Sequence, residues 1–283
     1  MLQRITTAPH LTFDALVAGE DGAPLVLLLH GFAESMHCWR TQVTALADMG
    51  YRPIAPSQRG YSPTARPDTR DASNYHIDRL MDDAMAIVAA NGYGAARFHL
   101  AGHDWGGSIA WALADRYPHR IASLSILSRP HPNAFNRALE TDPEQSQRSK
   151  HHRWFLEPGA ADVVLADDCK WLRERLAANG MPDEAIAEHL TVLGNKEAME
   201  AALAWYRARG AIRGPLGPIR VPTLYIWGDA DETVGRVAAE GTREFVVAPY
   251  RFEVLPGVGH FAADQVPDRV SELMLEHLRD HPV

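Results

Sequence analysis

The sequence predicts an α/β fold in which a mostly parallel sheet is covered by helices on both faces. Two observations favour this class. Short apolar runs alternate with helical stretches along most of the chain, and the run Pro24–Leu29 is apolar without interruption, as in a strand buried on both faces. Alternation of this kind produces parallel pairing because each crossover places a helix against the sheet.

The expected elements follow in order. Apolar runs predict strands near Leu11–Val17 and at Pro24–Leu29, and the stretch from Trp39 to Met49 predicts a helix. The remaining elements expected in the alternating parts are a strand at Tyr51–Ala55, a helix at Tyr75–Asn91, a strand at Arg97–Ala101, a helix at Gly106–Ala114, and strands at Ile121–Leu127, Val221–Ile226 and Tyr250–Leu255.

The alternation stops between Arg129 and about Gly217. Apolar strand runs vanish there, and helical stretches rich in Ala, Glu, Leu and Arg replace them, with prolines near both ends. We therefore expect two parts, a core formed by residues 1–128 and 218–283 and an all-helical cap formed by residues 129–217. A lid of this kind is where groups that select the substrate should lie.

Composition narrows the class of protein. The 283 residues are 46% hydrophobic, enough for one large core and a smaller lobe, and the net charge of −8 argues against a nucleic acid or an anionic membrane as partner. The two cysteines, Cys38 and Cys169, lie far apart in the sequence, which favours a reducing cytoplasm over a disulfide framework.

Targeting and cofactor signals are also missing from the sequence. We find no signal peptide, no run long enough for a membrane span, no metal-spaced His/Cys cluster and no glycine-rich phosphate loop. The prediction is a protein without cofactor or metal. Its partners are expected to be a small apolar substrate and water, and a homodimer stays open.

Asp104 stands at the centre of Gly102-His103-Asp104-Trp105-Gly106, the pattern of a sharp strand-to-helix turn that carries a nucleophile. That position usually holds serine, so the nucleophile here is a carboxylate. A carboxylate that attacks an acyl carbon forms a labile mixed anhydride, whereas attack on a saturated carbon bearing an epoxide oxygen or a halogen forms an ordinary ester. Water can cleave that ester, so Asp104 favours epoxides or organohalides as substrates and disfavours a serine-type esterase.

The partners of such a nucleophile follow in the expected order. Asp231 comes directly after the apolar run Val221–Ile226 and is the candidate acid, with Asp229 as the alternative. His260, in a glycine-flanked loop after Tyr250–Leu255, is the candidate base. The order nucleophile, acid, histidine is that of the α/β-hydrolases rather than of other triad folds.

An oxyanion hole needs two backbone donors. The buried run Pro24–Leu29 delivers His30-Gly31-Phe32, so the N–H groups of Phe32 and Trp105 could converge on one oxygen. In this chemistry the oxyanion forms when water attacks the Asp104 ester, so the hole would serve the second, hydrolytic step.

These motifs together resemble the epoxide hydrolase branch of the α/β-hydrolase superfamily. The resemblance spans almost the whole chain and implies an α/β-hydrolase fold with an inserted helical cap. It also implies a cofactor-independent hydrolase that opens epoxides to vicinal diols through an alkyl-enzyme ester on Asp104. The matching segments are His30-Gly31-Phe32-Ala33-Glu34-Ser35 with Trp39-Arg40, Gln58-Arg59-Gly60-Tyr61-Ser62, Gly102 to Gly107, Trp205-Tyr206-Arg207 and Val258-Gly259-His260-Phe261.

The resemblance also assigns groups in the cap. Tyr206 resembles one of the two tyrosines with which epoxide hydrolases hold the epoxide oxygen, and a phenol there would protonate the departing alkoxide. The second tyrosine is missing. His151, or alternatively His152, stands at its place, so we expect His151 and Tyr206 to form the acid pair.

Dehalogenases are the alternative, because they share the Asp, the His and the fold. Haloacetate dehalogenases also pair a lid histidine with a tyrosine, but their carboxylate-binding arginines correspond here to Trp105 and Ser108. Haloalkane dehalogenases pair the indole after the nucleophile with an Asn or a second Trp, and Phe32 stands where that Asn would be. The remaining indole candidates in the lid are Trp154, Trp171 and Trp205.

Two further points stay open at this stage. Ala33 replaces the proline that usually follows His-Gly-Phe in the family. A ligand receptor without catalysis, built on the same fold, would have no need to keep every member of the triad.

Overall fold

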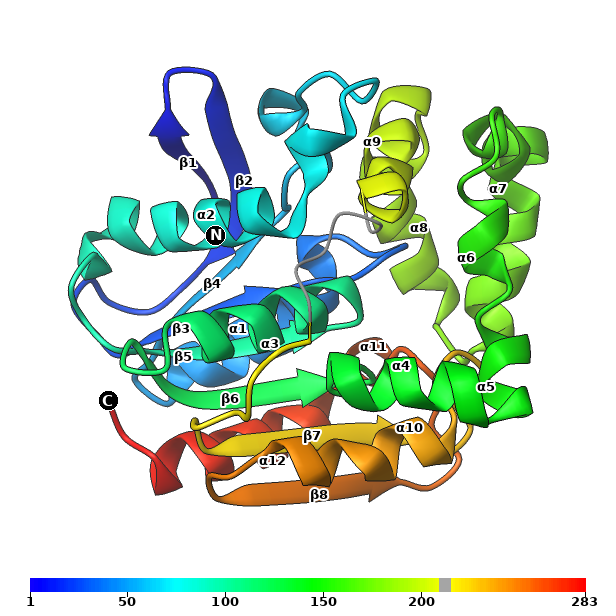
Figure 1. The fold of residues 1–283 in the computed structure, drawn as a ribbon. Helices are drawn as coiled ribbons and strands as arrows, with labels where there is room; N and C mark the ends of the chain where they lie inside the picture. Colours follow the sequence, from blue (N-terminus) through cyan, green and yellow to red (C-terminus); the bar gives the residue numbers. More distant parts are fainter. Residues whose placement is uncertain (209–214) are drawn as a thin grey trace.

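The computed structural model describes residues 1–208 and 215–283 and contains an eight-stranded sheet with the order β1-β2-β4-β3-β5-β6-β7-β8 (Figure 1). Strands β1 and β2 pair antiparallel, as do β2 and β4, and all other neighbours pair parallel. The predicted α/β class with a mostly parallel sheet is therefore correct. The strands are β1 (Leu2–Ala8), β2 (Leu11–Val17), β3 (Leu25–Leu29), β4 (Arg52–Pro56), β5 (Phe98–His103), β6 (Ile121–Leu127), β7 (Thr223–Gly228) and β8 (Tyr250–Leu255).

Three strands, β2, β6 and β8, have the predicted bounds, and the others differ from prediction by a few residues at their ends. Strand β1 was not predicted. Its sequence holds one buried apolar side chain, Ile5, and the strand lies at the edge of the sheet, where one side is free of pairing. An edge strand needs no continuous apolar run, so the pattern that reveals central strands misses it.

Strand β3 separates two apolar cores on the two faces of the sheet. Leu25, Leu27 and Leu29 point into one core, which α2 and α3 cover, and Val26 and Leu28 point into the other, which α1 and α12 cover. All five side chains are buried because successive residues of a strand face opposite sides. The covering helices are α1 (Arg40–Asp48), α2 (Ile77–Val88), α3 (Trp105–Arg116), α10 (Arg236–Gly241), α11 (Ala262–Gln265) and α12 (Pro267–Asp280).

Short helical turns explain where the predicted helix bounds were too wide. The 3₁₀ turn η1 precedes α1, η3 precedes α2, and the π turn η4 follows α2. These turns have other hydrogen-bond patterns, although their side chains continue the helical periodicity. The turns are η1 (Met36–Trp39), η2 (Pro63–Ala65), η3 (Ala72–Tyr75), η4 (Ala89–Tyr93) and η6 (Thr242–Phe245).

Between β6 and β7 the described residues form helices and loops up to Ala208. The helices are α4 (Pro132–Thr141), α5 (Pro143–Arg148), α6 (His151–Trp154), α7 (Ala160–Ala178), α8 (Asp183–Leu193) and α9 (Lys196–Ala208) (Figure 1). The backbone of α7 is not continuous, since Ala166 is extended and residues 167–169 have positive φ. Helix α4 packs beside α10, and Arg137 pairs with Glu244 at 2.7 Å. The boundary of the cap at residue 129 stays a prediction.

None of the helices within residues 1–208 and 215–283 combines the length and apolar character needed to cross a membrane.

The turn between β5 and α3 positions Asp104. Its backbone has φ +46° and ψ −115°, a conformation that few side chains adopt. Glycines allow the turn to pack tightly. A Cβ on Gly106 would lie 2.1 Å from the Leu29 carbonyl oxygen, and one on Gly102 would lie 2.4 Å from the Gly106 carbonyl oxygen. Helix α3 therefore begins directly against β3, and Asp104 lies at the carboxyl end of the parallel strands.

Replacing Gly106 with alanine should lower the free energy of unfolding by ~3 kcal/mol, the upper part of the usual range for overpacking, because the added methyl meets backbone atoms rather than a flexible side chain. Urea unfolding measures the loss. The matched control is Gly94→Ala, where φ is −56° and the nearest atom, the Ala89 Cβ, lies 3.7 Å away. Equal stability of Gly106→Ala and wild type would contradict the close-packed turn.

Candidate active site

The carboxylate of Asp104 lies against the loop that follows β3. Strands β3 and β5 are parallel neighbours, so the residues that follow them meet at one edge of the sheet. The Phe32 N–H donates to Asp104 Oδ1 at 3.1 Å, and the Phe32–Ala33 peptide bond is cis. The Trp105 N–H, the other predicted donor, makes no hydrogen bond to this carboxylate among the described residues.

The loops after β7 and β8 bring Asp231 and His260 together. His260 Nδ1 lies 2.8 Å from Asp231 Oδ2, and the Thr233 and Val234 N–H groups donate to Asp231 Oδ1 at 2.7 and 2.9 Å. A carboxylate only accepts, so Nδ1 carries the proton of the neutral ring and Nε2 carries the lone pair. Nε2 faces Asp104 Oδ2 at 3.9 Å.

Asp229, the alternative acid, is placed differently. It is exposed, and its Oδ1 accepts a hydrogen bond from the Gly257 N–H at 2.7 Å. It therefore ties together the loops after β7 and β8, and the contact with the imidazole belongs to Asp231.

The charge state of Asp104 follows from its surroundings. Burial by itself would raise the pKa of this carboxyl, but the electrostatic effects of the neighbouring His260, Arg129 and His103 and the hydrogen bond from the Phe32 N–H outweigh it, and the pKa is lowered. Asp104 is therefore ionised at neutral pH, the state in which a carboxylate acts as a nucleophile.

A buried ion pair lies behind Asp104. Glu34 Oε2 accepts hydrogen bonds from His103 Nδ1 at 2.6 Å and from the Gly31 N–H at 3.0 Å, while His103 Nε2 donates to the carbonyl oxygen of His260 at 2.9 Å. Burial disfavours the charged ring, but the Glu34 carboxylate prevails and raises the pKa of His103 to about 9. One imidazolium thus joins the loop after β3 to the backbone of His260.

Sequence analysis assigned no role to Glu34 or His103. Glu34 lies in the segment after the first buried strand, and His103 directly precedes Asp104. An acidic and a basic side chain in these two segments could have indicated an ion pair. Their contact is visible only once β3 and β5 are neighbours.

Tyr206 on α9 and His151 on α6 both line a cavity of about 80 Å³ that also contains Asp104 and His260. Tyr206 packs edge-on against the rings of Phe32, Trp105 and Phe155, with centroid distances of 5.4, 5.2 and 4.9 Å. His152, the alternative to His151, packs against Tyr206 and Phe135 and is not among the lining residues.

The state of His151 differs from the expectation of an acid. Burial lowers its pKa to about 4. Its Nδ1 lies 3.0 Å from the Arg148 carbonyl oxygen, so the neutral ring donates there and keeps the lone pair on Nε2. At neutral pH the free nitrogen of His151 therefore accepts hydrogen bonds and has no proton to give.

The indoles expected to hold a halide form two contacting pairs, Trp105 with Trp205 and Trp154 with Trp171. Trp205 Nε1 donates to the Arg59 carbonyl oxygen at 3.0 Å, and Trp154 packs on Trp171 at a centroid distance of 4.8 Å. Trp171 lines the cavity at Asp104, whereas Trp105 lines a different one. Trp105 and Trp205 pack edge-on at a centroid distance of 5.8 Å, but the N–H of Trp205 is engaged by Arg59 and neither indole lines the cavity at Asp104.

A cluster with metal-ligand chemistry lies beside the ion pair. One ligand atom from each of Glu34, His189 and Asp264 lies within 4.8 Å of the others. His189 bridges Ser35 Oγ and Asp264 Oδ2, each at 3.1 Å, and Arg40 pairs with Asp264 at 2.7 Å. These groups form hydrogen bonds and an ion pair with one another, so they can be buried without losing their polar partners.

The sequence and the fold of this chain match those of known proteins. Residues 24–267 match a family model described as the alpha/beta hydrolase fold. The chain is 32% identical to Epoxide hydrolase 4 from Homo sapiens, over 95% of this chain and 76% of that protein. It is 30% identical to Epoxide hydrolase A from Mycobacterium tuberculosis, over 98% and 97% of the two chains. A solved structure described as a novel epoxide hydrolase from metagenomes of hot environments aligns with a TM-score of 0.86 and 30% identity over 98% of each chain.

The ion pair behind the nucleophile predicts a pH dependence of stability. The pKa of His103 is higher in the folded protein than the ordinary 6.5, so this group contributes fully below pH 6.5 and its contribution is lost as the pH rises through about 9. The free energy of unfolding should fall across that window by at most ~1.4 kcal/mol per pH unit.

Urea unfolding between pH 6 and 9.5 measures this slope, and Glu34→Gln should flatten it. The control is Asp162→Asn, which breaks an exposed ion pair with Lys196 and should keep the slope. A Glu34→Gln profile parallel to that of the wild type would show that the charge of His103 does not depend on Glu34.

Proposed function

This chain belongs to the α/β-hydrolase superfamily, in its epoxide hydrolase branch, and we propose from that premise that it opens epoxides to vicinal diols through a covalent ester on Asp104. One observation carries the proposal. An ionised carboxylate, rather than a hydroxyl, lies at the turn after β5, with a backbone N–H on one oxygen and the lone pair of His260 facing the other.

The first step is attack by Asp104. Because Phe32 holds Oδ1, we assign Oδ2 as the attacking atom. Oδ2 forms a bond to one epoxide carbon, the bond from that carbon to the epoxide oxygen breaks, and the electron pair passes to the oxygen. Tyr206, in the same cavity, donates its phenolic proton to that alkoxide, a contribution on the order of 10²–10⁴ in rate.

The second step is hydrolysis of the ester. His260 Nε2 takes a proton from water as the water oxygen attacks Asp104 Cγ, and Asp231 stabilises the imidazolium that forms. The charge that develops on Oδ1 is held by the Phe32 N–H, with Trp105 as the second donor. Collapse of this intermediate breaks the bond between Cγ and Oδ2, and the imidazolium of His260 protonates the departing Oδ2 of the diol. The second proton of the water returns to the Tyr206 phenolate, which restores the carboxylate, the histidine and the tyrosine.

His151 takes a different part from the one that the resemblance implies. With a pKa of about 4 and its N–H directed to Arg148, it serves near neutral pH as a hydrogen-bond acceptor. We therefore assign the proton transfer to the epoxide oxygen to Tyr206 alone.

Tyr206 and His151 both belong to residues 129–217, which we propose as the cap over a core of residues 1–128 and 218–283. We also propose a cytoplasmic location, because Cys38 and Cys169 are unpaired thiols. Hydrolysis of carbon–halogen bonds, which would use the same ester, is less well supported. The indole N–H of Trp205 is bonded elsewhere, and the relatives reported above carry the name epoxide hydrolase.

Replacing His260 with glutamine should trap the ester, because Asp104 attacks without the base but water is not activated. Intact-protein mass spectrometry after incubation with styrene oxide should show the enzyme heavier by one substrate mass, on a peptide containing Asp104. The Asp104→Ala variant is the control and should stay unmodified. An unmodified His260→Gln enzyme, with an epoxide that the wild type hydrolyses, would contradict the covalent mechanism.

Replacing Tyr206 with phenylalanine should slow ester formation on the order of 10²–10⁴. Stopped-flow measurement of the wild type should show a rate that does not titrate between pH 5 and 8, because a pKa of about 4 keeps His151 neutral throughout. His151→Tyr should preserve or raise the rate by adding a donor.

The control for the tyrosine is Tyr93→Phe, which loses a hydrogen bond to the Ala23 carbonyl outside the cavity. Normal ester formation in Tyr206→Phe would refute the assignment of the acid. A rate that falls through pH 6 to 7 in the wild type, and becomes flat in His151→Tyr, would return the acid role to His151.

A further inference from the structure

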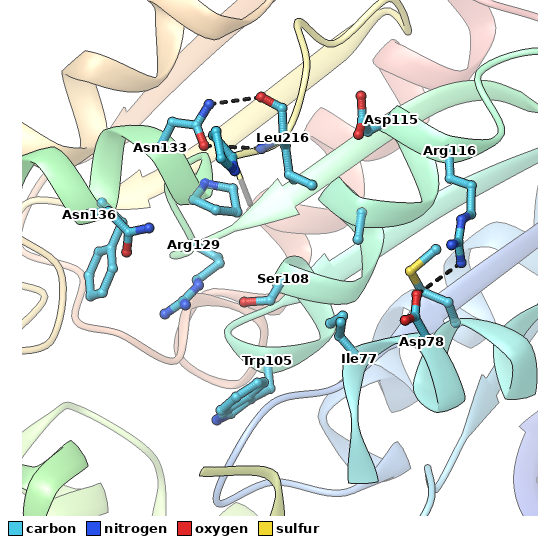
Figure 2. Close-up of a pocket in the computed structure, with 15 residues that line it drawn as sticks. Ile77, Asp78, Trp105, Ser108, Asp115, Arg116, Arg129, Asn133, Asn136 and Leu216 are labelled. Carbon is cyan, nitrogen blue, oxygen red and sulfur yellow. Dashed lines mark hydrogen bonds and ion pairs between the residues drawn. The ribbon is translucent and has the colours of Figure 1, made fainter. Parts of the chain in front are cut away.

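A second cavity of about 440 Å³ lies beside Trp105 and is larger than the one at Asp104 (Figure 2). It is bounded by α2, by α3, by the start of α4 and by Pro215 and Leu216. Trp105 packs edge-on against Tyr206 at 5.2 Å, and Tyr206 lines the smaller cavity, so one pair of rings stands between the two. Much of the lining is apolar, from Ile77, Met81, Ala112, Pro132, Phe135 and Leu216.

Arg129 enters this cavity with its charge unpaired. The residue is 7% exposed, and among residues 1–208 and 215–283 its guanidinium forms no ion pair or hydrogen bond. It lies over the ring of Phe135, 4.7 Å from the centroid, and its stem lies on the first turn of α3, where a Cβ on Gly107 would be 2.7 Å from the Arg129 Cβ. A buried guanidinium without a hydrogen-bonded anion is costly, so an anion that reaches Arg129 would be stabilised at this position.

Ser108 supplies a second unused donor. Its hydroxyl oxygen is buried and has no hydrogen-bond partner. In Figure 2 the hydroxyl of Ser108 points to the side of the cavity on which the Arg129 side chain lies, and both residues line this cavity. A planar guanidinium and a hydroxyl together suit the two oxygens of a carboxylate.

The described lining at the opposite end of the cavity carries one arginine and two carboxylates. Arg116 pairs there with Asp78 at 3.0 Å, and Asp115 adds a further negative charge. An anion is therefore attracted to the end formed by Arg129 and Ser108, and an apolar body extends along Ile77 and Met81.

We propose that this cavity binds a small organic carboxylate with an apolar body, anchored by Arg129 and Ser108. The acid group is either part of an epoxide substrate that reaches past Trp105 or belongs to a free acid bound beside the active site. The charge of Arg129 already acts on the nucleophile, since it helps to lower the pKa of Asp104. A ligand here is thus coupled to the reacting group.

Calorimetric titration tests the site without any turnover. The probe is 4-phenylbutyrate, and 4-phenylbutanol is its uncharged counterpart. Wild type should prefer the acid, and Arg129→Gln should weaken binding of the acid on the order of 10- to 100-fold while leaving the alcohol unchanged. Arg129→Lys should fall between, and Ser108→Ala should lose several-fold. The matched control is Arg116→Gln, which removes the paired arginine of the same cavity and should keep the affinity.

A turnover arm distinguishes the two sources and alone rests on the proposed epoxide hydrolysis. Competitive inhibition of styrene oxide hydrolysis by 4-phenylbutyrate, lost in Arg129→Gln, supports the site as part of the substrate route. If 4-phenylbutyrate binds and changes the rate of styrene oxide hydrolysis without changing KM, the result supports a free acid bound beside the active site. Equal affinity of wild type for acid and alcohol, or a loss in Arg116→Gln but not in Arg129→Gln and Ser108→Ala, would overturn the proposal. Since the titration needs no reaction, its result holds even if no epoxide is hydrolysed.

Discussion

Close contact between the turn after β5 and the end of β3 is the constraint on which the candidate site depends. Gly106 lies against the Leu29 carbonyl so tightly that a single methyl group would not fit. This contact sets the start of α3, the unusual backbone of Asp104 and the distance from Asp104 to the Phe32 N–H. Asp104 and its backbone donor are therefore positioned by packing rather than by flexible side chains, which is the condition for preorganised stabilisation of charge.

Several charged groups are buried around that turn, and each one affects the charge or the position of a neighbouring group. His103 is held protonated by Glu34 and contacts the backbone of His260. Asp231 orients the ring of His260 through Oδ2, while its Oδ1 accepts hydrogen bonds from the N–H groups of Thr233 and Val234. The positive groups keep Asp104 ionised although it is buried. A nucleophilic carboxylate in an apolar surrounding would otherwise gain a proton and lose its reactivity.

Two cavities of different character adjoin Trp105 and Tyr206. The smaller holds the proposed catalytic groups, and the larger is mostly apolar with an unpaired arginine at one end. A cavity of about 80 Å³ leaves room for little more than the reacting part of a substrate, since pockets that bury whole ligands are ~300–1,000 Å³. Selection among epoxides would then depend on the larger cavity, on the other side of the rings of Trp105 and Tyr206. Arg129 gives that cavity a preference for negative charge.

The sequence by itself determined the class of fold, the central strands and the residues of the strand-to-helix turn around Asp104, because those features are local. An apolar run without interruption reports burial on both faces, and glycines around an aspartate report a tight turn. Strand β1 escaped prediction because an edge strand needs no such run. Tertiary structure decided what depends on distance between segments: that Asp231 rather than Asp229 meets His260, that Glu34 charges His103, and that Arg129 is left unpaired. It also decided the state of His151. A pKa reflects burial and neighbouring dipoles, which residues far apart in the chain supply only after folding.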